Sequence, residues 1–155
     1  MEIRIGEVKA ADLTAIEGLV ENEFAYLDLD RYPFRQKLSD VRFRLLKVTC
    51  ENKFAGFLEL EWLESWVVRI NGLVVVPSFR RKGIARVLLE FALNDVRTRG
   101  ADTVTLLVSS NNEVAKQLYS SFGFSFDHVW PEHIQEKEVE VWKLDLATDT
   151  RINVC

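Results

Sequence analysis

Cysteine, proline and long apolar runs are all scarce in this sequence of 155 residues. Its two cysteines, Cys50 and Cys155, are too few and too far apart to suggest a disulfide framework or a cysteine-based zinc site. No apolar stretch approaches the roughly 18 residues of a membrane-spanning helix, and the first residues do not have the pattern of a signal peptide. We therefore expect a cytoplasmic protein with no membrane partner.

An excess of positive charge is also missing. Lys and Arg number 20 against 24 Asp and Glu, which gives a formal net charge of -4. A general nucleic-acid-binding domain is expected to be basic, so we predict no nucleic-acid partner. The apolar content of 48% is sufficient for one sizeable core. We expect a single domain over residues 1–146, followed by a tail over 147–155.

The spacing of the apolar residues predicts an α/β domain. Asn71-Gly72 interrupts one of the strands, and because apolar residues resume at once we interpret the interruption as a bulge. Residues 51–53 have the length of a hairpin turn. From the order of the expected strands and helices, we predict a mixed sheet of about seven strands flanked by about four helices. The expected strands are 3–8, 43–50, 54–62, 66–76, 103–109, 124–130 and 139–146, and the expected helices are 11–24, 34–38, 84–99 and 112–122.

The junction between the fourth strand and the next helix predicts an anion site. Residues 74–86 read V-V-V-P-S-F-R-R-K-G-I-A-R. Backbone N–H groups and the dipole at a helix N-terminus favour a bound phosphate, and Gly83 would let the backbone approach it without a Cβ. The common phosphate loops, G-x-x-x-x-G-K-[ST] and G-x-G-x-x-G, are absent. Four cationic side chains would surround the anion: Arg80, Arg81, Lys82 and Arg86.

Two segments resemble the GNAT superfamily of N-acetyltransferases. Residues 80–85, R-R-K-G-I-A, follow a V-x-P sequence and are similar to the family's acetyl-CoA-binding signature, Q/R-x-x-G-x-G/A. Residues 112–124, N-E-V-A-K-Q-L-Y-S-S-F-G-F, fill every fixed position of the family pattern N-x-x-A-x-x-L-Y-x-x-x-G-F. With the order of the elements, the resemblance covers nearly the whole chain and implies the GNAT fold.

The resemblance implies acetyl-CoA as the cosubstrate. It implies that the strand ending at Val76 diverges from the strand that starts at Thr103, with the pantetheine arm between them and the pyrophosphate on the amides of 81–86. Tyr119 is implied as the group near the CoA sulfur. The implied cofactor-binding residues are Leu73, Val74, Val75, Val76, Arg80, Arg81, Lys82, Gly83, Ile84, Ala85, Arg86 and Asn112.

Several of these residues also have an ordinary structural interpretation. Asn112 is suited to cap a helix, Tyr119 could be a core aromatic, and residues 80–82 could be a solvated basic loop. His128 and His133 lie five apart, but no further ligand pattern accompanies them, so we expect no metal.

A general base is not evident. The resemblance would place Glu or His at Leu107, and residues 66–76 contain neither Asp nor Glu. Glu59 and Glu61 are two apart on the third expected strand and so share one of its faces. They could border the acceptor site as catalytic carboxylates, or they could form a solvated strand face. If water takes the proton instead, weakly basic amines would be preferred to lysine side chains.

We predict direct acetyl transfer from acetyl-CoA to a primary amine, either a protein N-terminal α-amine or a small-molecule amine. Backbone N–H groups near Val75 and Val76 could stabilise the oxyanion. Two alternatives stay open: an acyl-CoA-binding regulatory module with little or no catalysis, and an interaction domain that keeps only the fold. A homodimer also stays open.

Overall fold

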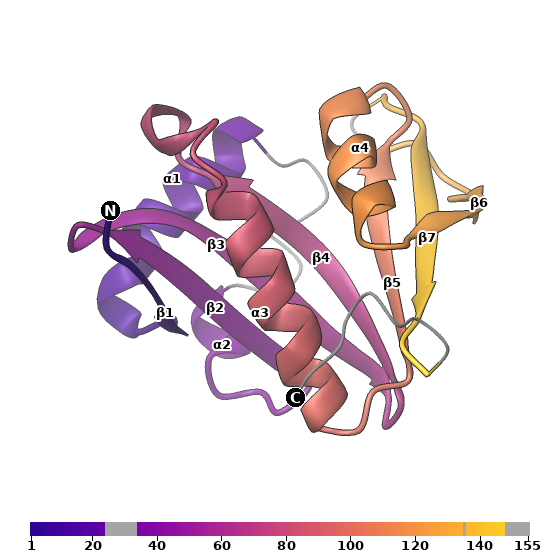
Figure 1. Cartoon of the computed structure of the whole chain (residues 1–155), viewed down its shortest axis with the longest axis horizontal. Helices are drawn as coiled ribbons and strands as arrows, with labels where there is room; N and C mark the ends of the chain where they lie inside the picture. The colour runs from indigo at the N-terminus through magenta and orange to yellow at the C-terminus, as the bar shows by residue number, and fades with distance from the viewer. Residues whose placement is uncertain (24–33, 135, 148–155) are drawn as a thin grey trace.

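The computed structural model describes residues 1–23, 34–134 and 136–147. In this part of the chain, seven strands form one sheet in the order β1-β2-β3-β4-β5-β7-β6 (Figure 1). All neighbours are antiparallel except β4 and β5. The predicted α/β fold with a mixed sheet is confirmed. The strands are β1 (Ile3–Glu7), β2 (Phe43–Cys50), β3 (Lys53–Glu64), β4 (Val67–Val75), β5 (Thr103–Ser109), β6 (Ser125–Val129) and β7 (Val139–Asp145).

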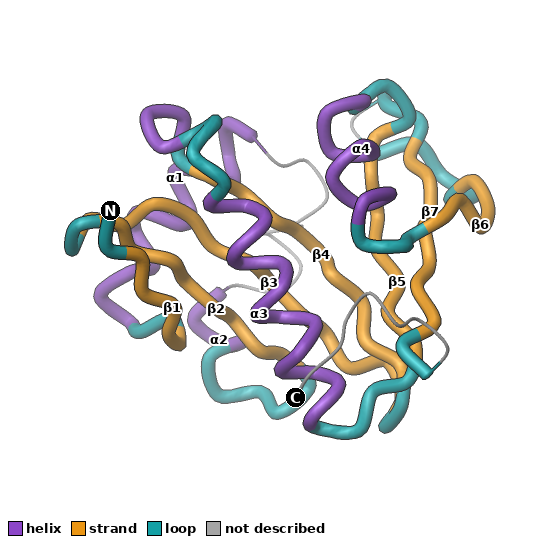
Figure 2. The backbone as a smooth tube through the Cα atoms, viewed as in Figure 1, coloured by secondary structure: helices purple, strands orange, loops and turns teal. Residues whose placement is uncertain are grey.

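Helices pack on both faces of the sheet (Figure 2). One face carries α3 (Ile84–Thr98), and the other carries α1 (Leu13–Glu23) and α2 (Phe34–Lys37). The remaining helix, α4 (Glu113–Ser121), stands beside β5 and β7. The helix expected over 11–24 is preceded by a 3-10 turn, and Phe24 lies outside the described residues. Among the described helices, none is long and apolar enough to cross a membrane.

Alternation along β3 assigns its side chains to the two faces. Leu58 and Leu60 belong to the cluster under α3, whereas Phe57 packs with Ile16 and Phe34 on the face of α1 and α2. A register shift against β2 at Ala55 changes the alternation at the start of β3. From Phe57 onwards, successive residues point to opposite faces, and the odd-numbered side chains lie on the α1 and α2 side.

The β2–β3 hairpin has the predicted short turn. Glu51 and Asn52 are the two residues between the strands, and their φ angles are 53° and 66°. Two-residue hairpin turns of type I′ need positive φ at both positions, because this twist matches the twist of the flanking strands. The hairpin prediction is therefore confirmed.

A charged contact holds α4 against β7. The Lys116 ammonium donates to the Ser110 carbonyl and to Glu140 Oε2, the latter at 3.0 Å, while Trp142 Nε1 donates to Glu140 Oε1 at 2.9 Å. Burial opposes ionisation of this carboxylate, but the hydrogen bonds from Trp142, Lys116 and Ser110 outweigh it and lower the pKa of Glu140.

Acid should weaken this contact. Because the folded-state pKa of Glu140 is below its ordinary value of 4.5, the ionised carboxylate adds stability above that value, and the stability is lost as the pH falls through the folded-state pKa. Replacing Glu140 with Gln should lower the free energy of unfolding at pH 7 by about 1–3 kcal/mol. Urea unfolding at several pH values between about pH 7 and pH 3 measures the free energy of unfolding of both proteins. On acidification, Glu140→Gln should lose less stability than the wild type. Identical acid sensitivity of the two proteins would exclude this contribution.

Candidate active site

The sheet opens between β4 and β5 (Figure 1). Their parallel pairing runs only from Val67 with Thr103 to Ile70 with Leu106. Beyond that point β4 continues beside β3, and β5 continues beside β7 as far as Ser109. The predicted divergence of the two strands is confirmed, and one side of β4 has no strand neighbour after Ile70 among the described residues.

A bulge in β4 lies where the opening begins. Glu59 pairs with Gly72 and Leu60 pairs with Ile70, so Asn71 is the extra residue on β4. The bulge shifts the alternation of β4: Ile70 packs in the cluster under α3, and Val74 packs in the cluster on the opposite face. The predicted bulge is confirmed.

The backbone of Val75 faces the opening. The Val76 N–H donates to the Ala55 carbonyl at 2.8 Å. Residues that bond to the neighbouring strand alternate with residues that do not, so the N–H and C=O groups of Val75 point away from β3. Of the two amides expected to stabilise an oxyanion, that of Val76 is already engaged by β3, which corrects the prediction for this residue. The Val75 amide remains.

The first turn of α3 carries N–H donors beside open space. Gly83 is the N-cap residue, with a φ of 76° in the left-handed region that favours glycine. The Val87 N–H donates to the Gly83 carbonyl at 3.1 Å, so the N–H groups of Ile84, Ala85 and Arg86 have no acceptor within the helix. A Cβ placed on Gly83 would meet nothing within 4 Å. The turn therefore has the donors and the room that a pyrophosphate needs.

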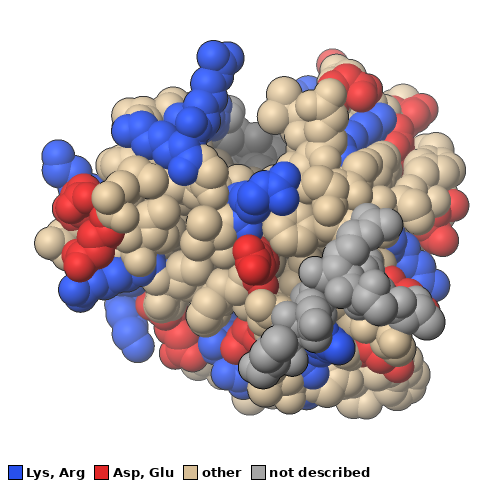
Figure 3. All heavy atoms as spheres, viewed as in Figure 1, with Lys and Arg blue, Asp and Glu red and all other residues tan. Residues whose placement is uncertain are grey.

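Basic side chains gather over this turn (Figure 3). Arg81 and Lys82 are exposed at its surface. Arg80 donates through Nε to the Val75 carbonyl at 3.0 Å and so fastens the loop to β4. The Arg86 guanidinium donates to Ser121 Oγ of α4 at 2.9 Å, so its side chain bridges two helices. Arg81 and Lys82 are thus the side chains best placed to add positive charge beside the N–H donors of the α3 turn.

The helix α4 borders the opening on the side away from α3 (Figure 1). Asn112 caps it, because Asn112 Oδ1 accepts from the Ala115 N–H at 3.1 Å. Tyr119 is 5% exposed, and its ring meets the Phe124 ring edge-on with 5.8 Å between centroids. The capping role of Asn112 is confirmed, and Tyr119 packs in the core as well as belonging to the helix beside the opening.

A connected set of polar side chains lies on the face of α1 and α2. Glu59 Oε1 accepts from Lys37 Nζ at 2.9 Å, and Glu59 Oε2 accepts from Asn71 Nδ2 at 2.6 Å. Glu61 Oε1 accepts from Asn71 Nδ2 at 3.0 Å and from Arg69 at 3.1 Å. Arg69 Nε also donates to Asn71 Oδ1 at 2.7 Å. We name these five residues the polar chain.

The two glutamates have unequal surroundings. The side chain of Glu59 is 0% exposed and that of Glu61 is 18% exposed, so the alternative of a solvated strand face is wrong. Both oxygens of Glu59 accept hydrogen bonds, whereas Glu61 Oε2 accepts none from the described residues. The structure brings the two carboxylates together, and within the described part of the chain Glu61 is the one of the two with an oxygen that accepts no hydrogen bond.

Sequence reasoning missed three members of the polar chain. Arg69 and Asn71 are two apart on β4, and the pairing places Arg69 opposite Glu61, so the hairpin pattern held a signal for both. Lys37 comes from α2, and nothing in its sequence context pointed to Glu59.

Side chains from the other half of the sheet complete this region. The Arg69 guanidinium lies 5.9 Å from the Trp130 ring, which follows β6. Leu107 lies on β5 opposite Val141 of β7, at the position where the family motif suggested a base. Its neighbours Leu106 and Val108 belong to the cluster under α3, so Leu107 lies on the face of the polar chain and brings no titratable group to it.

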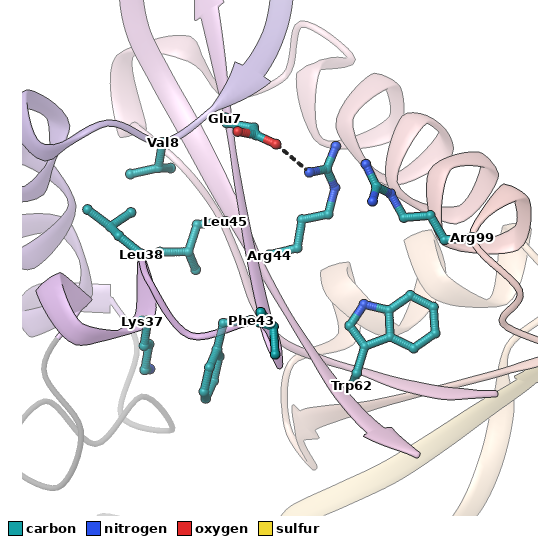
Figure 4. A pocket seen from close by; sticks show the side chains of 10 residues that line it. Glu7, Val8, Lys37, Leu38, Phe43, Arg44, Leu45, Trp62 and Arg99 are labelled. Carbon is teal, nitrogen blue, oxygen red and sulfur yellow. Dashed lines mark hydrogen bonds and ion pairs between the residues drawn. The ribbon is translucent and has the colours of Figure 1, made fainter. Parts of the chain in front are cut away.

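A pocket of about 180 Å³ lies near the C-terminal end of α3, away from the opening (Figure 4). Glu7, Arg44, Trp62 and Arg99 line part of it. Arg44 donates to Glu7 at 2.7 Å and to Asp95 at 2.6 Å, so its charge is already paired.

In the described part of the chain, no group of three His, Cys, Asp or Glu side chains could hold a metal ion.

The family follows from a comparison with known proteins. The model of the acetyltransferase (GNAT) family matches residues 13–124, a span that includes the opening, the turn at Gly83 and α4. This chain belongs to the GNAT family. The resemblance of its two sequence motifs to that family is therefore confirmed.

Relatives of this GNAT chain carry related names. The [ribosomal protein bS18]-alanine N-acetyltransferase of Salmonella typhimurium is 34% identical over 84 residues, 54% of this chain and 56% of the relative. The chain thus spans about half the length of the curated relatives it matches.

Solved structures share the GNAT fold. The ribosomal-protein-S18-alanine N-acetyltransferase from Escherichia coli has a TM-score of 0.79 at 21% identity, over 99% of this chain and 100% of that one. The spermidine N-acetyltransferase from Vibrio cholerae, in complex with CoA and spermine, has a TM-score of 0.78 at 21% identity, over 94% of this chain and 96% of that one.

Proposed function

We propose that this GNAT protein transfers an acetyl group from acetyl-CoA directly to a primary amine. One observation carries the proposal: the opening between β4 and β5 has the N–H donors of the α3 turn at its end and the carboxylates of the polar chain on one face. The family match and the names of the relatives support the same reaction class. No observation favours a regulatory module without catalysis.

Acetyl-CoA is proposed to bind along β4 and the α3 turn. Its pyrophosphate would accept from the N–H groups of residues 81–86, with Arg81 and Lys82 adding charge. Its pantetheine arm would lie beside Leu73–Val76, where the strand has lost its neighbour. Because Arg80 already donates to the Val75 carbonyl, its role is to hold the loop in place.

The reaction requires a neutral amine, a donor to the developing oxyanion and a proton for the departing thiolate. Glu61 would accept the proton of the bound ammonium, since its Oε2 accepts no hydrogen bond from the described residues and its side chain is partly exposed. The Val75 N–H would donate to the thioester oxygen as charge develops there. As the carbon–sulfur bond breaks, the Tyr119 hydroxyl would protonate the sulfur, directly or through water. The phenolate so formed would regain a proton from the nitrogen of the tetrahedral intermediate, which releases one as it becomes the amide. Glu59, which is buried and fully bonded, would support Glu61.

The proposed acceptor is a primary amine, either the α-amine of a protein N-terminus or a small-molecule amine. The relative from Salmonella is named for an alanine of ribosomal protein bS18, and the neighbour from Vibrio is named for spermidine. An α-amine with a pKa of about 8 is about 10% neutral at pH 7, whereas a lysine amine near 10.4 is about 0.04% neutral. A site with one accessible carboxylate should therefore favour the α-amine.

A panel of amines tests the proposal. CoA release is followed with acetyl-CoA and three acceptors: a peptide that begins with alanine, spermidine, and a lysine peptide with a blocked N-terminus. At pH 7 the α-amine should react more than about tenfold faster than the lysine. Glu61→Gln should lower turnover about ten- to hundredfold. Strong activity on lysine, undiminished in both Glu59→Gln and Glu61→Gln, would refute the carboxylate role and the amine preference together.

A further inference from the structure

We infer that Lys37, Glu59 and Asn71 are positioning residues for the acceptor: they hold Glu61 so that its Oε2 atom receives the acceptor ammonium, and they couple that atom to α2. This inference rests on the proposed acetyl transfer and names the part of the molecule that would orient the amine. None of the three residues needs to touch the acceptor.

The hydrogen bonds of the polar chain leave one acceptor atom unused. An Asn side chain has two N–H donors and one carbonyl. Asn71 gives its donors to Glu59 and Glu61, and its carbonyl accepts from Arg69. Both Glu59 oxygens are engaged, and Glu61 Oε1 accepts twice. Among the described residues nothing donates to Glu61 Oε2, so an ammonium can bind there without breaking a bond of the chain.

Folding stability alone does not explain the buried charges of Lys37 and Glu59, at the α2 end of the polar chain. The side chains of Lys37 and Glu59 are 6% and 0% exposed. Desolvation offsets most of the attraction within such a pair, and apolar residues of similar size are often at least as stabilising. The pair is nevertheless fixed in place, with the Lys37 ammonium 4.6 Å from the Phe34 ring centre and 5.2 Å from that of Phe43. A rigid, directional contact is suited to fixing the position of its neighbours.

The polar chain also lies where an acceptor would have to arrive. Asn71 directly follows Ile70, the last residue of β4 that pairs with β5. Arg69 contacts Trp130, which comes from the other half of the sheet. An amine that entered from the face of α1 and α2 would meet Glu61 before it reached a thioester in the opening. A shift of α2 would reach Glu61 through three successive hydrogen bonds.

The test compares two lysine–carboxylate pairs on the same face of the sheet. The double variant Lys37→Met/Glu59→Gln removes the buried pair without leaving an unpaired charge. The control, Lys47→Met, breaks the pair of Lys47 with Asp12, 2.8 Å apart. Neither residue takes part in the hydrogen bonds of the polar chain among the described residues. Steady-state kinetics are measured with acetyl-CoA and two acceptors, the alanine-first peptide and spermidine, and the Kd of acetyl-CoA is measured separately.

The double variant should raise the KM of the better acceptor about tenfold and leave the acetyl-CoA Kd within about twofold. Asn71→Ala removes the side chain that joins Glu59 to Glu61 and keeps the pair of Lys37 with Glu59. It should also raise the acceptor KM and leave the acetyl-CoA Kd nearly unchanged. If the double variant does not fold, this variant alone tests the inference. Lys47→Met should change neither constant.

Three results would overturn the inference. An unchanged acceptor KM in both folded variants, with an active wild type, overturns it and leaves the proposed function intact. A parallel loss of acetyl-CoA affinity would mean that the polar chain only supports the fold. A wild type that acetylates neither acceptor overturns the proposed function and the inference with it.

Discussion

Replacing Gly83 with Val is expected to abolish acetyl-CoA binding. Gly83 has a φ of 76°, and the space around its Cβ position is empty to 4 Å. A β-branched side chain is strongly disfavoured at this φ and would fill the space that the pyrophosphate has to enter. The change therefore removes both the turn geometry and the room beside the N–H donors.

A matched variant separates lost binding from lost stability. Gly100 follows the other end of α3, has a φ of 106°, and is also open around its Cβ position. Gly83→Val and Gly100→Val should each cost about 1–3 kcal/mol of folding stability through backbone strain.

The binding itself is measured as a thermal shift. At an acetyl-CoA concentration about 100 times its Kd, a gain of about 2.7 kcal/mol should raise the Tm of the wild type and of Gly100→Val by about 5–10 °C. Gly83→Val should show no shift. An equal shift in all three proteins would refute the assignment of the pyrophosphate to this turn.

Replacing Tyr119 with Phe is expected to lower turnover about hundredfold or more while leaving acetyl-CoA affinity nearly unchanged. A phenol with an ordinary pKa of about 10 can donate a proton to a thiolate whose conjugate acid is near 8.5, and phenylalanine cannot. The ring of Tyr119 is buried against Phe124, and Phe keeps that packing.

The outcome distinguishes a proton donor from a core aromatic. If Tyr119 protonates the sulfur, kcat falls and the Kd of acetyl-CoA stays within about twofold. If the residue serves only to pack α4 against Phe124, the Phe variant keeps its turnover, and the proton has to come from water or another group.

Local sequence patterns predicted most of the fold. The bulge at Asn71-Gly72 was predicted because apolar residues continue on both sides of it, and the β2–β3 hairpin because its turn is short. The α3 turn was predicted from Gly83 and the cations before it. Each of these features depends on residues close together in sequence, so a single segment contains the physical reason.

The parts of the site that were missed depend on tertiary contacts. Glu59 was interpreted either as a base or as a solvated residue, and the decisive fact is that Lys37, 22 residues earlier, covers it. Val76 was expected to offer its N–H to substrate, but the bond to Ala55 exists because β3 continues beside it. The side chain of Arg86 reaches Ser121, 35 residues later, only because α3 and α4 lie close together.

CoA release by the wild-type protein, measured with and without the alanine-first peptide, tests acetyl transfer most directly. The account predicts thiol release that depends on the peptide and saturates with its concentration, and a peptide product heavier by one acetyl group at its α-amine. Acetyl-CoA that raises the Tm but releases no more thiol with the peptide, with spermidine or with the lysine peptide than without them would contradict the account, and would identify the protein as a binding module.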